Sequence, residues 1–242
     1  MSLAGSLLRP YSGRPLPLLK VPPSPASARW LIRSQSRRAR TLKRTGDIVF
    51  SLAVLLLGSP LYLVLALLVK LTSPGPVFYV QRRVGRGYRS FGCIKFRTMR
   101  VDADRALADL LARSPELRAE YQRDFKLKRD PRITPIGVFL RRSSLDELPQ
   151  FLNVLRGQMS VVGPRPIVSA ELERYGSCMD EVLSVRPGLT GLWQVSGRNN
   201  LSYRRRVRLD LAYSRDRNVA LDLAIIIRTI GVILFPMDRG AY

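Results

Sequence analysis

The sequence predicts an α+β fold that is mostly helical, in a monotopic membrane protein with one re-entrant membrane helix and a small β-hairpin. Three observations lead to this prediction. An uncharged apolar run covers residues 48–69 and is interrupted by Ser59 and Pro60. A glycine-rich turn joins two β-forming segments between residues 77 and 96, and amphipathic helical patterns follow it. Hydrophobic residues make up 46% of the 242-residue chain, which is ample for a core.

Residues 1–44 are predicted to form a disordered basic arm. They contain ten lysines and arginines, no acid, and a stretch rich in proline and serine. Such a composition buries too little apolar surface to offset the entropy of ordering. The apolar run begins too far from the N-terminus, and lacks the small-residue cleavage pattern, for a secretory signal peptide.

Residues 45–72 are predicted to form the re-entrant membrane helix. The 22 uncharged residues would make a helix of about 33 Å, enough to cross a hydrocarbon core of about 30 Å, so a kinked span is the alternative. However, basic clusters flank both ends of the run, and positive residues favour the cytoplasmic side. A hairpin that turns at Ser59 and Pro60 keeps both clusters on that side. Pro60 removes a backbone donor, and the Ser59 hydroxyl can satisfy the freed carbonyl.

The charge balance and the missing histidine limit the functions that the chain can have. Lysines and arginines number 41 against 18 acids, a net charge of +23 that must face nucleic acid, lipid headgroups or phosphorylated substrates. The absence of histidine excludes Ser-His-Asp and Cys-His catalysis and nearly all zinc sites. Cys93 and Cys178 form no CxxC pair and are most simply reduced thiols in a cytosolic setting.

Residues 73–242 are predicted to form a cytoplasmic domain that begins with the hairpin, whose strands are expected at 77–81 and 91–96. A pair of amphipathic helices follows, broken at Ser114 and Pro115. Lys95 and Arg97 alternate with Ile94 and Phe96, so both basic side chains would project from one face of the second strand. That pattern is ordinary strand amphipathicity, and it also suits a phosphate-binding surface.

Asp146 and Glu147 are adjacent acids in a basic neighbourhood. A capping box, with Ser144 as the N-cap and Glu147 three residues into the helix, is the simple structural explanation. Pro149 compromises it, because a proline at that position clashes with the carbonyl four residues back. A carboxylate kept ionised by a helix N-terminus and nearby arginines has low proton affinity, as an anionic nucleophile or a Mg²⁺ ligand requires.

Arg165 stands between two prolines in the stretch GPRP, which forms a rigid turn. A guanidinium matches two phosphate oxygens at once, so fixing its direction lowers the entropic cost of binding phosphate. A solvated loop arginine explains this motif equally well.

Several segments together resemble the bacterial sugar transferases, the monotopic phosphoglycosyl transferases. The resemblance extends from residue 40 to residue 242 and is carried by four stretches in one order: KRTGDIVFSL with SPLYLVLALLVKLTSPGPVFYVQRRVG, FGCIKFRTM, DPRITPIGVFLRRSSLDELPQFLNVLRGQMSVVGPRP, and RPGLTGLWQVSGR. It implies an enzyme of the bacterial inner membrane, with interfacial helices and an active site on the cytoplasmic face. Such an enzyme moves a phosphosugar from a nucleotide sugar, here expected to be a UDP-sugar, to polyprenyl phosphate and so initiates synthesis of exopolysaccharide, O-antigen or a related glycan.

The resemblance also implies roles for individual residues. Asp146 would be the nucleophile, acting through an aspartyl-phosphosugar intermediate, and a Mg²⁺ ligand, with Glu147 as its partner acid or base. Asp210 would complete the polar site, and Ser59 with Pro60 would be the break of the membrane helix. The residues that would hold phosphates are Lys95, Arg97, Arg165 and Arg198. A homo-oligomer is left open.

Two other functions compete with the transferase. A basic nucleic-acid-binding protein would carry helix-turn-helix or RNA-stacking signatures, and none is evident, so no nucleic acid is expected as a partner. A non-enzymatic membrane scaffold predicts that Asp146 is dispensable. Both rank below the transferase.

Overall fold

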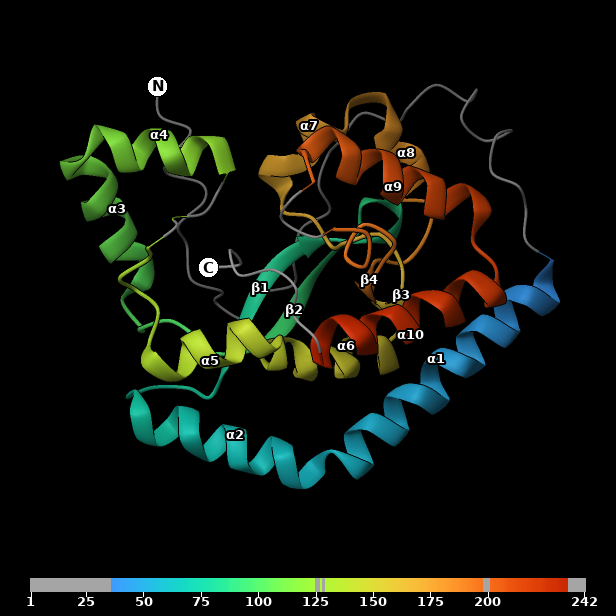
Figure 1. The fold of residues 1–242 in the computed structure, drawn as a ribbon, viewed down its shortest axis with the longest axis horizontal. Coiled ribbons are helices and arrows are strands. Elements are labelled where there is room, and N and C mark those ends of the chain that lie inside the picture. The colour runs from blue at the N-terminus through green and yellow to red at the C-terminus, as the bar shows by residue number, and fades with distance from the viewer. Residues whose placement is uncertain (1–35, 125–126, 128, 198–200, 235–242) are drawn as a thin grey trace.

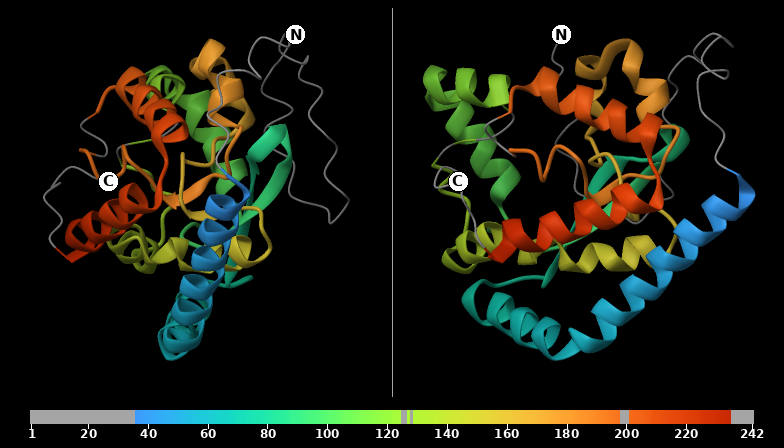
Figure 2. Two further views of the ribbon diagram at one scale, coloured as in Figure 1. Left: turned by 90° about the vertical axis from the view of Figure 1, so that its right-hand side faces the viewer. Right: turned by 45° about the vertical axis from the view of Figure 1, so that its right-hand side comes forward.

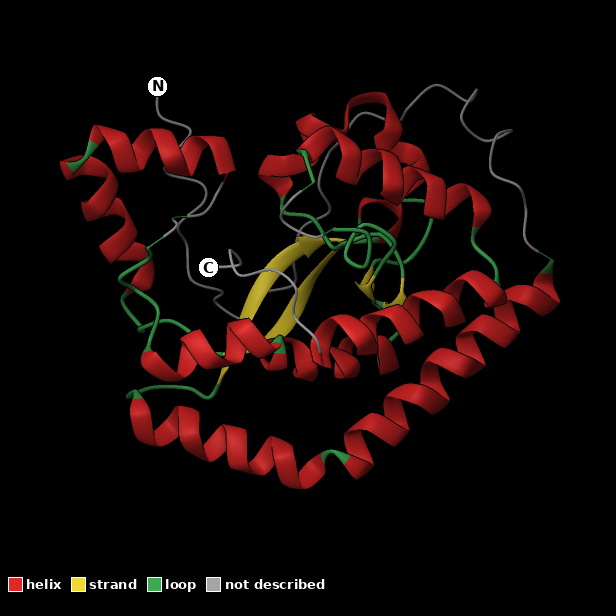
Figure 3. Ribbon diagram, in the orientation of Figure 1, coloured by secondary structure: helices red, strands yellow, loops and turns green. Residues whose placement is uncertain are grey.

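A computed structural model describes residues 36–124, 127, 129–197 and 201–234. Their helices surround two small sheets (Figure 3), in agreement with the predicted α+β class. The α-helices are α1 (Arg37–Leu57), α2 (Ser59–Thr72), α3 (Ala103–Arg113), α4 (Pro115–Asp124), α5 (Pro135–Ser143), α6 (Phe151–Leu155), α7 (Leu172–Tyr175), α8 (Met179–Val182), α9 (Tyr203–Asp216) and α10 (Val219–Leu234). The strands are β1 (Phe78–Val84), β2 (Ser90–Phe96), β3 (Ser160–Val162) and β4 (Gly188–Thr190). Short 3-10 helices are η3 (Arg86–Tyr88), η4 (Leu145–Gln150), η5 (Ser169–Glu171) and η6 (Gly176–Cys178).

The elements are stacked on a bent pair of helices (Figures 1 and 2). Helices α1 and α2 form a V along one side, and α5, α6 and α10 lie above it. The hairpin of β1 and β2 rises from this layer toward α7, α8 and α9, while α3 and α4 form a separate arm. The hairpin therefore connects this layer with α7, α8 and α9.

Helix α1 begins at Arg37, inside the segment assigned to the arm, and not at residue 45. Ser36 caps it by accepting a hydrogen bond from the Ala39 amide. Arg44 donates to the carbonyls of Val154 (2.7 Å) and Leu155 (2.9 Å) at the end of α6. Contacts with segments far along the chain thus order residues whose local composition favours disorder.

A second anchor of α1 is the buried Asp47. Lys43 bridges it to Asp222 of α10, at 3.0 and 2.9 Å. The Asp47 carboxylate also accepts from the Ser160 hydroxyl (2.8 Å) and the Val161 amide (3.1 Å) of β3. This network joins the V to the body of the protein.

The break between α1 and α2 lies where it was predicted, and the helical path bends by 63° there. Pro60 lies in the first turn of α2 and has no N–H to donate to the Leu56 carbonyl. The Ser59 hydroxyl donates to that carbonyl at 2.8 Å, as expected. Gly58 contributes too, because a Cβ there would lie 2.5 Å from the Val54 carbonyl oxygen.

Taken singly, none of the helices in the described ranges is long and apolar enough to cross a bilayer; α1 and α2 together meet that criterion of length and composition. Their outer face is apolar, whereas Leu65 and Val69 on the inner face pack against Phe96 and Leu140. An exposed apolar surface of this extent normally marks an interaction site. Its members are Val49, Phe50, Leu52, Leu56, Leu57, Leu61, Leu63, Val64, Leu67, Leu68 and Leu71.

The predicted hairpin is confirmed, and its strands extend toward the turn. Both cover seven residues, because the chain reverses within the short segment that contains Gly87, at φ 62°. The Gly87 amide donates to the Leu183 carbonyl (2.8 Å), which holds the turn against the end of α8. The register pairs Gln81 with Cys93 and Tyr79 with Lys95, so these side chains share one face.

Two other expectations have clear outcomes. The helix pair is broken at Ser114, whose hydroxyl accepts from the Leu117 amide, as predicted. The capping box is absent: Ser144 has a left-handed conformation (φ 58°) that ends α5, and its side chain caps nothing. The parallel pairing of β3 with β4 was not predicted, because strands of three residues show too little periodicity.

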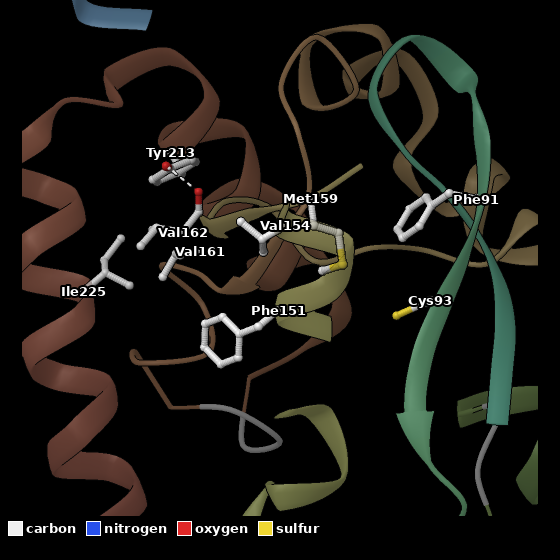
Figure 4. Close-up of a cluster of buried hydrophobic side chains, with 9 residues drawn as sticks. All are labelled: Phe91, Cys93, Phe151, Val154, Met159, Val161, Val162, Tyr213 and Ile225. Atoms are coloured by element: carbon white, nitrogen blue, oxygen red, sulfur yellow. Dashed lines mark hydrogen bonds between the residues drawn. The ribbon is translucent and has the colours of Figure 1, made fainter. Parts of the chain in front are cut away.

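The largest buried cluster joins the hairpin, α6, β3, α9 and α10 (Figure 4). Tyr213 of α9 donates to the Val162 carbonyl at 2.9 Å, so its ring is held against β3 at one side of the cluster. The cluster consists of Phe91, Cys93, Phe151, Val154, Met159, Val161, Val162, Tyr213 and Ile225. Cys93 is a free thiol inside it, as expected.

Candidate active site

Three of the predicted site residues meet where η4 crosses the second strand. Asp146 and Glu147 lie in the first turn of η4, which the left-handed Ser144 turns back from α5. Lys95 of β2 points at both: its Nζ lies 2.6 Å from Glu147 Oε1 and 3.8 Å from Asp146 Oδ2. Asp146 is buried, and the other two are partly exposed. The hairpin therefore supplies the cation for a carboxylate pair on a neighbouring element.

The pKa values of the two carboxyl groups shift in opposite directions, and that of Asp146 departs from the expectation. Burial raises the pKa of Asp146 to about 6, although the charge of Lys95 acts to lower it. The prediction that Asp146 has a low proton affinity is therefore wrong. Burial also opposes ionisation of Glu147, but the charge and hydrogen bond of Lys95, with Arg165 and Arg83, keep its pKa below the ordinary value. Desolvation dominates where the cation is 3.8 Å away, and the ion pair dominates where it is 2.6 Å away.

Arg165 continues the site away from Asp146. Glu171 and Glu147, with Tyr175 and Asp210, overcome the effect of burial and raise the pKa of its guanidinium. The guanidinium also lies over the Trp193 ring, 5.8 Å from the centroid. The GPRP turn thus places a cation between the Glu147 end of the site and the Asp210 end.

Asp210 of α9 has no solvent exposure. Its Oδ2 accepts from the Tyr175 hydroxyl at 3.0 Å, and its Oδ1 has no hydrogen-bond partner in the described part of the chain. Burial raises the pKa of this carboxyl to about 7, although the Tyr175 hydrogen bond and Arg165 oppose the shift. Asp210 therefore lies at the polar end of the site, as a carboxyl that titrates near neutral pH.

Two predicted residues are not placed in this cluster. Arg97 is buried and donates to the carbonyls of Ser73 (2.7 Å) and Pro74, just beyond α2. Its hydrogen bonds therefore tie the end of the V to the hairpin. Arg198 lies outside the described residues.

Sequence reasoning missed Arg83 and Glu171. Arg83 is buried, donates to the Pro166 carbonyl (2.9 Å) and to Gln81 (2.6 Å), and lies 3.9 Å from Glu171. It shares the face of the hairpin that carries Lys95. The sequence carries one signal for Arg83: in a strand, Gln81 and Arg83 lie two residues apart and share a face. The expected strand ended at residue 81, so this signal was not recognised.

The donor set can be compared with the needs of Mg²⁺. Among the described residues no group of three or more His, Cys, Asp or Glu side chains could hold a metal ion. Mg²⁺ at phosphate sites commonly takes only one or two carboxylates and completes its shell with water and substrate phosphate oxygens. Because Glu147 already forms a close ion pair with Lys95, Asp146 is the carboxylate that fits the role of a Mg²⁺ ligand.

A buried carboxylate beside an ion-paired one, with a lysine and two arginines, is an arrangement suited to phosphoryl transfer. The bent helix pair with its apolar outer face lies beneath the layer that carries η4. These features define the class as a candidate phosphotransferase.

The chain belongs to the bacterial sugar transferase family, whose model matches residues 38–236. It is 51% identical over 207 residues to an undecaprenyl-phosphate galactose phosphotransferase of Salmonella typhimurium, a match that covers 85% of this chain and 43% of that protein. It is 47% identical over 200 residues to the exopolysaccharide production protein ExoY of Rhizobium meliloti, covering 83% and 88%. It is also 40% identical over 200 residues to a UDP-glucose:undecaprenyl-phosphate glucose-1-phosphate transferase of Escherichia coli, covering 79% and 40%. The chain thus spans less than half the length of several curated relatives that it matches.

Proposed function

We propose that the protein transfers a phosphosugar from a nucleotide diphosphate sugar, a UDP-sugar, to polyprenyl phosphate and so starts the assembly of a surface polysaccharide. The observation that carries the proposal is the convergence of Asp146, Glu147, Lys95 and Arg165. The activities for which the Salmonella and Escherichia relatives are named, and the exopolysaccharide role of the Rhizobium relative, support the choice of substrates.

In the first step, an Asp146 carboxylate oxygen attacks the β-phosphorus of the donor. The bond from that phosphorus to the bridging oxygen breaks, its electron pair leaves with the nucleoside monophosphate, and an aspartyl phosphosugar forms. In the second step, a phosphate oxygen of the lipid attacks the same phosphorus. The bond to Asp146 then breaks, which regenerates the carboxylate and releases the polyprenyl diphosphosugar. Each step exchanges one P–O bond for another.

The surrounding groups hold charge in place during both steps. Lys95, Arg83 and Arg165 offset the negative charge on the phosphoryl oxygens. Glu147 stays anionic at neutral pH, so it holds Lys95 and can act as a base but not as an acid. Asp146 would hold Mg²⁺ together with diphosphate oxygens, and the ion would supply further charge neutralisation.

The membrane placement is part of the same proposal. The bend of 63° and the apolar outer face of the V favour a helix that enters and leaves one leaflet. Helix α10 adds an exposed apolar row that suits an interfacial position, formed by Val219, Leu223, Ile227, Ile230 and Ile233. With both ends of the V on the cytoplasmic side of the bacterial inner membrane, the site lies at the level of the lipid phosphate.

The test compares the wild type with Asp146→Asn, using polyprenyl phosphate, Mg²⁺ and a panel of UDP-sugars. We expect UMP release by the wild type, a mass increase of one phosphosugar when donor alone is added, and neither in Asp146→Asn. The control is Asp109→Asn, the same change at an exposed position of α3. Normal turnover of Asp146→Asn would favour a scaffold or another nucleophile, and wild-type turnover without an adduct would indicate direct displacement.

A further inference from the structure

Three buried polar atoms at the Asp210 end of the site have no hydrogen-bond partner in the described part of the chain: Trp193 Nε1, Tyr203 Oη and Asp210 Oδ1. Leaving such a group unpaired costs about 1–3 kcal/mol, so folded proteins rarely tolerate several together. An indole N–H donates, a carboxylate oxygen accepts, and a phenol does either. The three atoms therefore offer both a hydrogen-bond donor and a hydrogen-bond acceptor to a ligand.

These atoms belong to one group of side chains around Arg165, which we name the distal cluster: Tyr175, Trp193, Tyr203 and Asp210. The Tyr203 ring meets the Tyr175 ring edge-on at 6.0 Å. The Tyr175 hydroxyl bonds Asp210, and the Arg165 guanidinium lies over Trp193. Helix α9 contributes Tyr203 and Asp210, and the turns that follow β3 and β4 contribute Arg165 and Trp193.

Two further guanidinium groups cover the aromatic faces of the cluster. Arg174 lies 5.1 Å from the centroid of Tyr203, and Arg206 lies 5.1 Å from that of Trp193. Arg174 also donates to the Gln122 carbonyl at 3.1 Å, which joins α7 to the neighbouring end of α4 (Figure 1). Flat cations against aromatic rings are surfaces on which a planar heterocycle can stack.

The order of residues along the site assigns a direction to the donor. Asp146, with Lys95 and Glu147, lies at one end, Arg165 in the middle, and the distal cluster at the other. If Asp146 attacks the β-phosphorus, Arg165 is placed to hold the diphosphate. The part of the donor that reaches the distal cluster is then a group beyond the phosphates.

We propose that the distal cluster is the subsite for the nucleoside of the donor, an inference that rests on the proposed function. A uracil carbonyl can accept from Trp193, while a base N–H or a ribose hydroxyl can donate to Asp210. Tyr203 can bond either kind of group, and the planar base can stack on the guanidinium groups that cover the Trp193 and Tyr203 rings. A sugar ring could pair with the same polar atoms but has no planar face, so a sugar subsite is the competing result.

The test measures UMP binding by calorimetry in Tyr203→Phe, which removes one hydroxyl, and in Trp193→Phe, which removes the indole N–H together with part of the ring. Losing one neutral hydrogen bond should weaken UMP binding and raise the KM for the donor by about threefold to tenfold. Discharge of the preformed phosphosugar adduct by polyprenyl phosphate should stay within twofold, because the nucleoside has already left. Tyr88→Phe, which removes a hydroxyl bonded to Asp180 at the tip of the hairpin, is the control and should change neither.

Unchanged UMP binding in both variants would overturn the assignment. So would a change confined to the preference among UDP-sugars, since that result would place the sugar here. The two hypotheses fail separately: a wild type that binds UMP but transfers no phosphosugar contradicts the proposed function, whereas a wild type that turns over normally with unaltered variants contradicts the nucleoside subsite.

Discussion

Replacing Asp210 by Asn should stabilise the fold at neutral and alkaline pH. Asp210 is fully buried on α9, and burial raises its pKa from 3.8 to about 7. The folded protein therefore binds more protons at this site than the unfolded chain between these two values. Stability must fall as pH rises through that interval, and above pH 7 the full cost of burying the charge remains.

The size of the effect follows from the shift. About three pKa units, at about 1.4 kcal/mol each, amount to a cost of about 4 kcal/mol above pH 7. The Asn oxygen can still accept from Tyr175, while its amide group replaces Oδ1 without a partner, which costs about 1–3 kcal/mol. The expected net gain in unfolding free energy at pH 8 is about 1–3 kcal/mol.

The measurement is urea unfolding of detergent-solubilised wild type and Asp210→Asn at pH 5 and pH 8, followed by tryptophan fluorescence. The wild type should lose stability between these values relative to the variant. Asp216→Asn, at the exposed end of the same helix, is the control. An Asp210→Asn variant that is less stable than the wild type at pH 8, or that keeps the same pH dependence, would refute the reasoning.

Two further predictions concern the V. Arg97→Met should lower the free energy of unfolding by about 2–4 kcal/mol, because it leaves two carbonyls beyond α2 without a donor. The KM for the donor should change less than threefold. A raised KM at unchanged stability would instead support the substrate-binding role expected from the sequence. Replacing Ser59 by Ala together with Pro60 by Leu should straighten the bend and abolish activity. In this variant, without the native cysteines, a thiol placed by Ser36→Cys should react with a membrane-impermeant reagent on intact cells, whereas one placed by Ser177→Cys should not. If residue 36 is labelled while Ser59 and Pro60 are still present, the helix pair spans the membrane and the re-entrant prediction is wrong.

Local chemistry made much of the framework predictable. Pro60 with Ser59, and Ser114 with Pro115, mark helix breaks because proline removes a donor whatever the tertiary context. The hairpin followed from β-forming runs around glycines. Lys95 was expected to hold phosphate and Glu147 to act as an acid or base in the same site, but their ion pair was not predicted, since no local pattern gives the distance between β2 and η4.

The rest depended on contacts between distant segments. The roles of Arg83 and Arg97 are set by carbonyls at Pro166, Ser73 and Pro74, and no spacing rule identifies such partners. The same reasoning explains the wrong expectation for Asp146. Neighbouring arginines in the sequence suggested a low proton affinity, but burial is a property of the fold and outweighs them.

The anchor at Asp47 has a consequence for synthesis of the chain. Its partners Ser160 and Val161 lie 113 and 114 residues downstream. At about 5–20 residues per second, Asp47 is synthesised about 6–23 s before they are. Of the groups described around it, Lys43 alone is made earlier, one helical turn away. Lys43 can therefore neutralise this carboxylate while α1 and α2 are newly made, before the later half of the chain supplies the remaining partners.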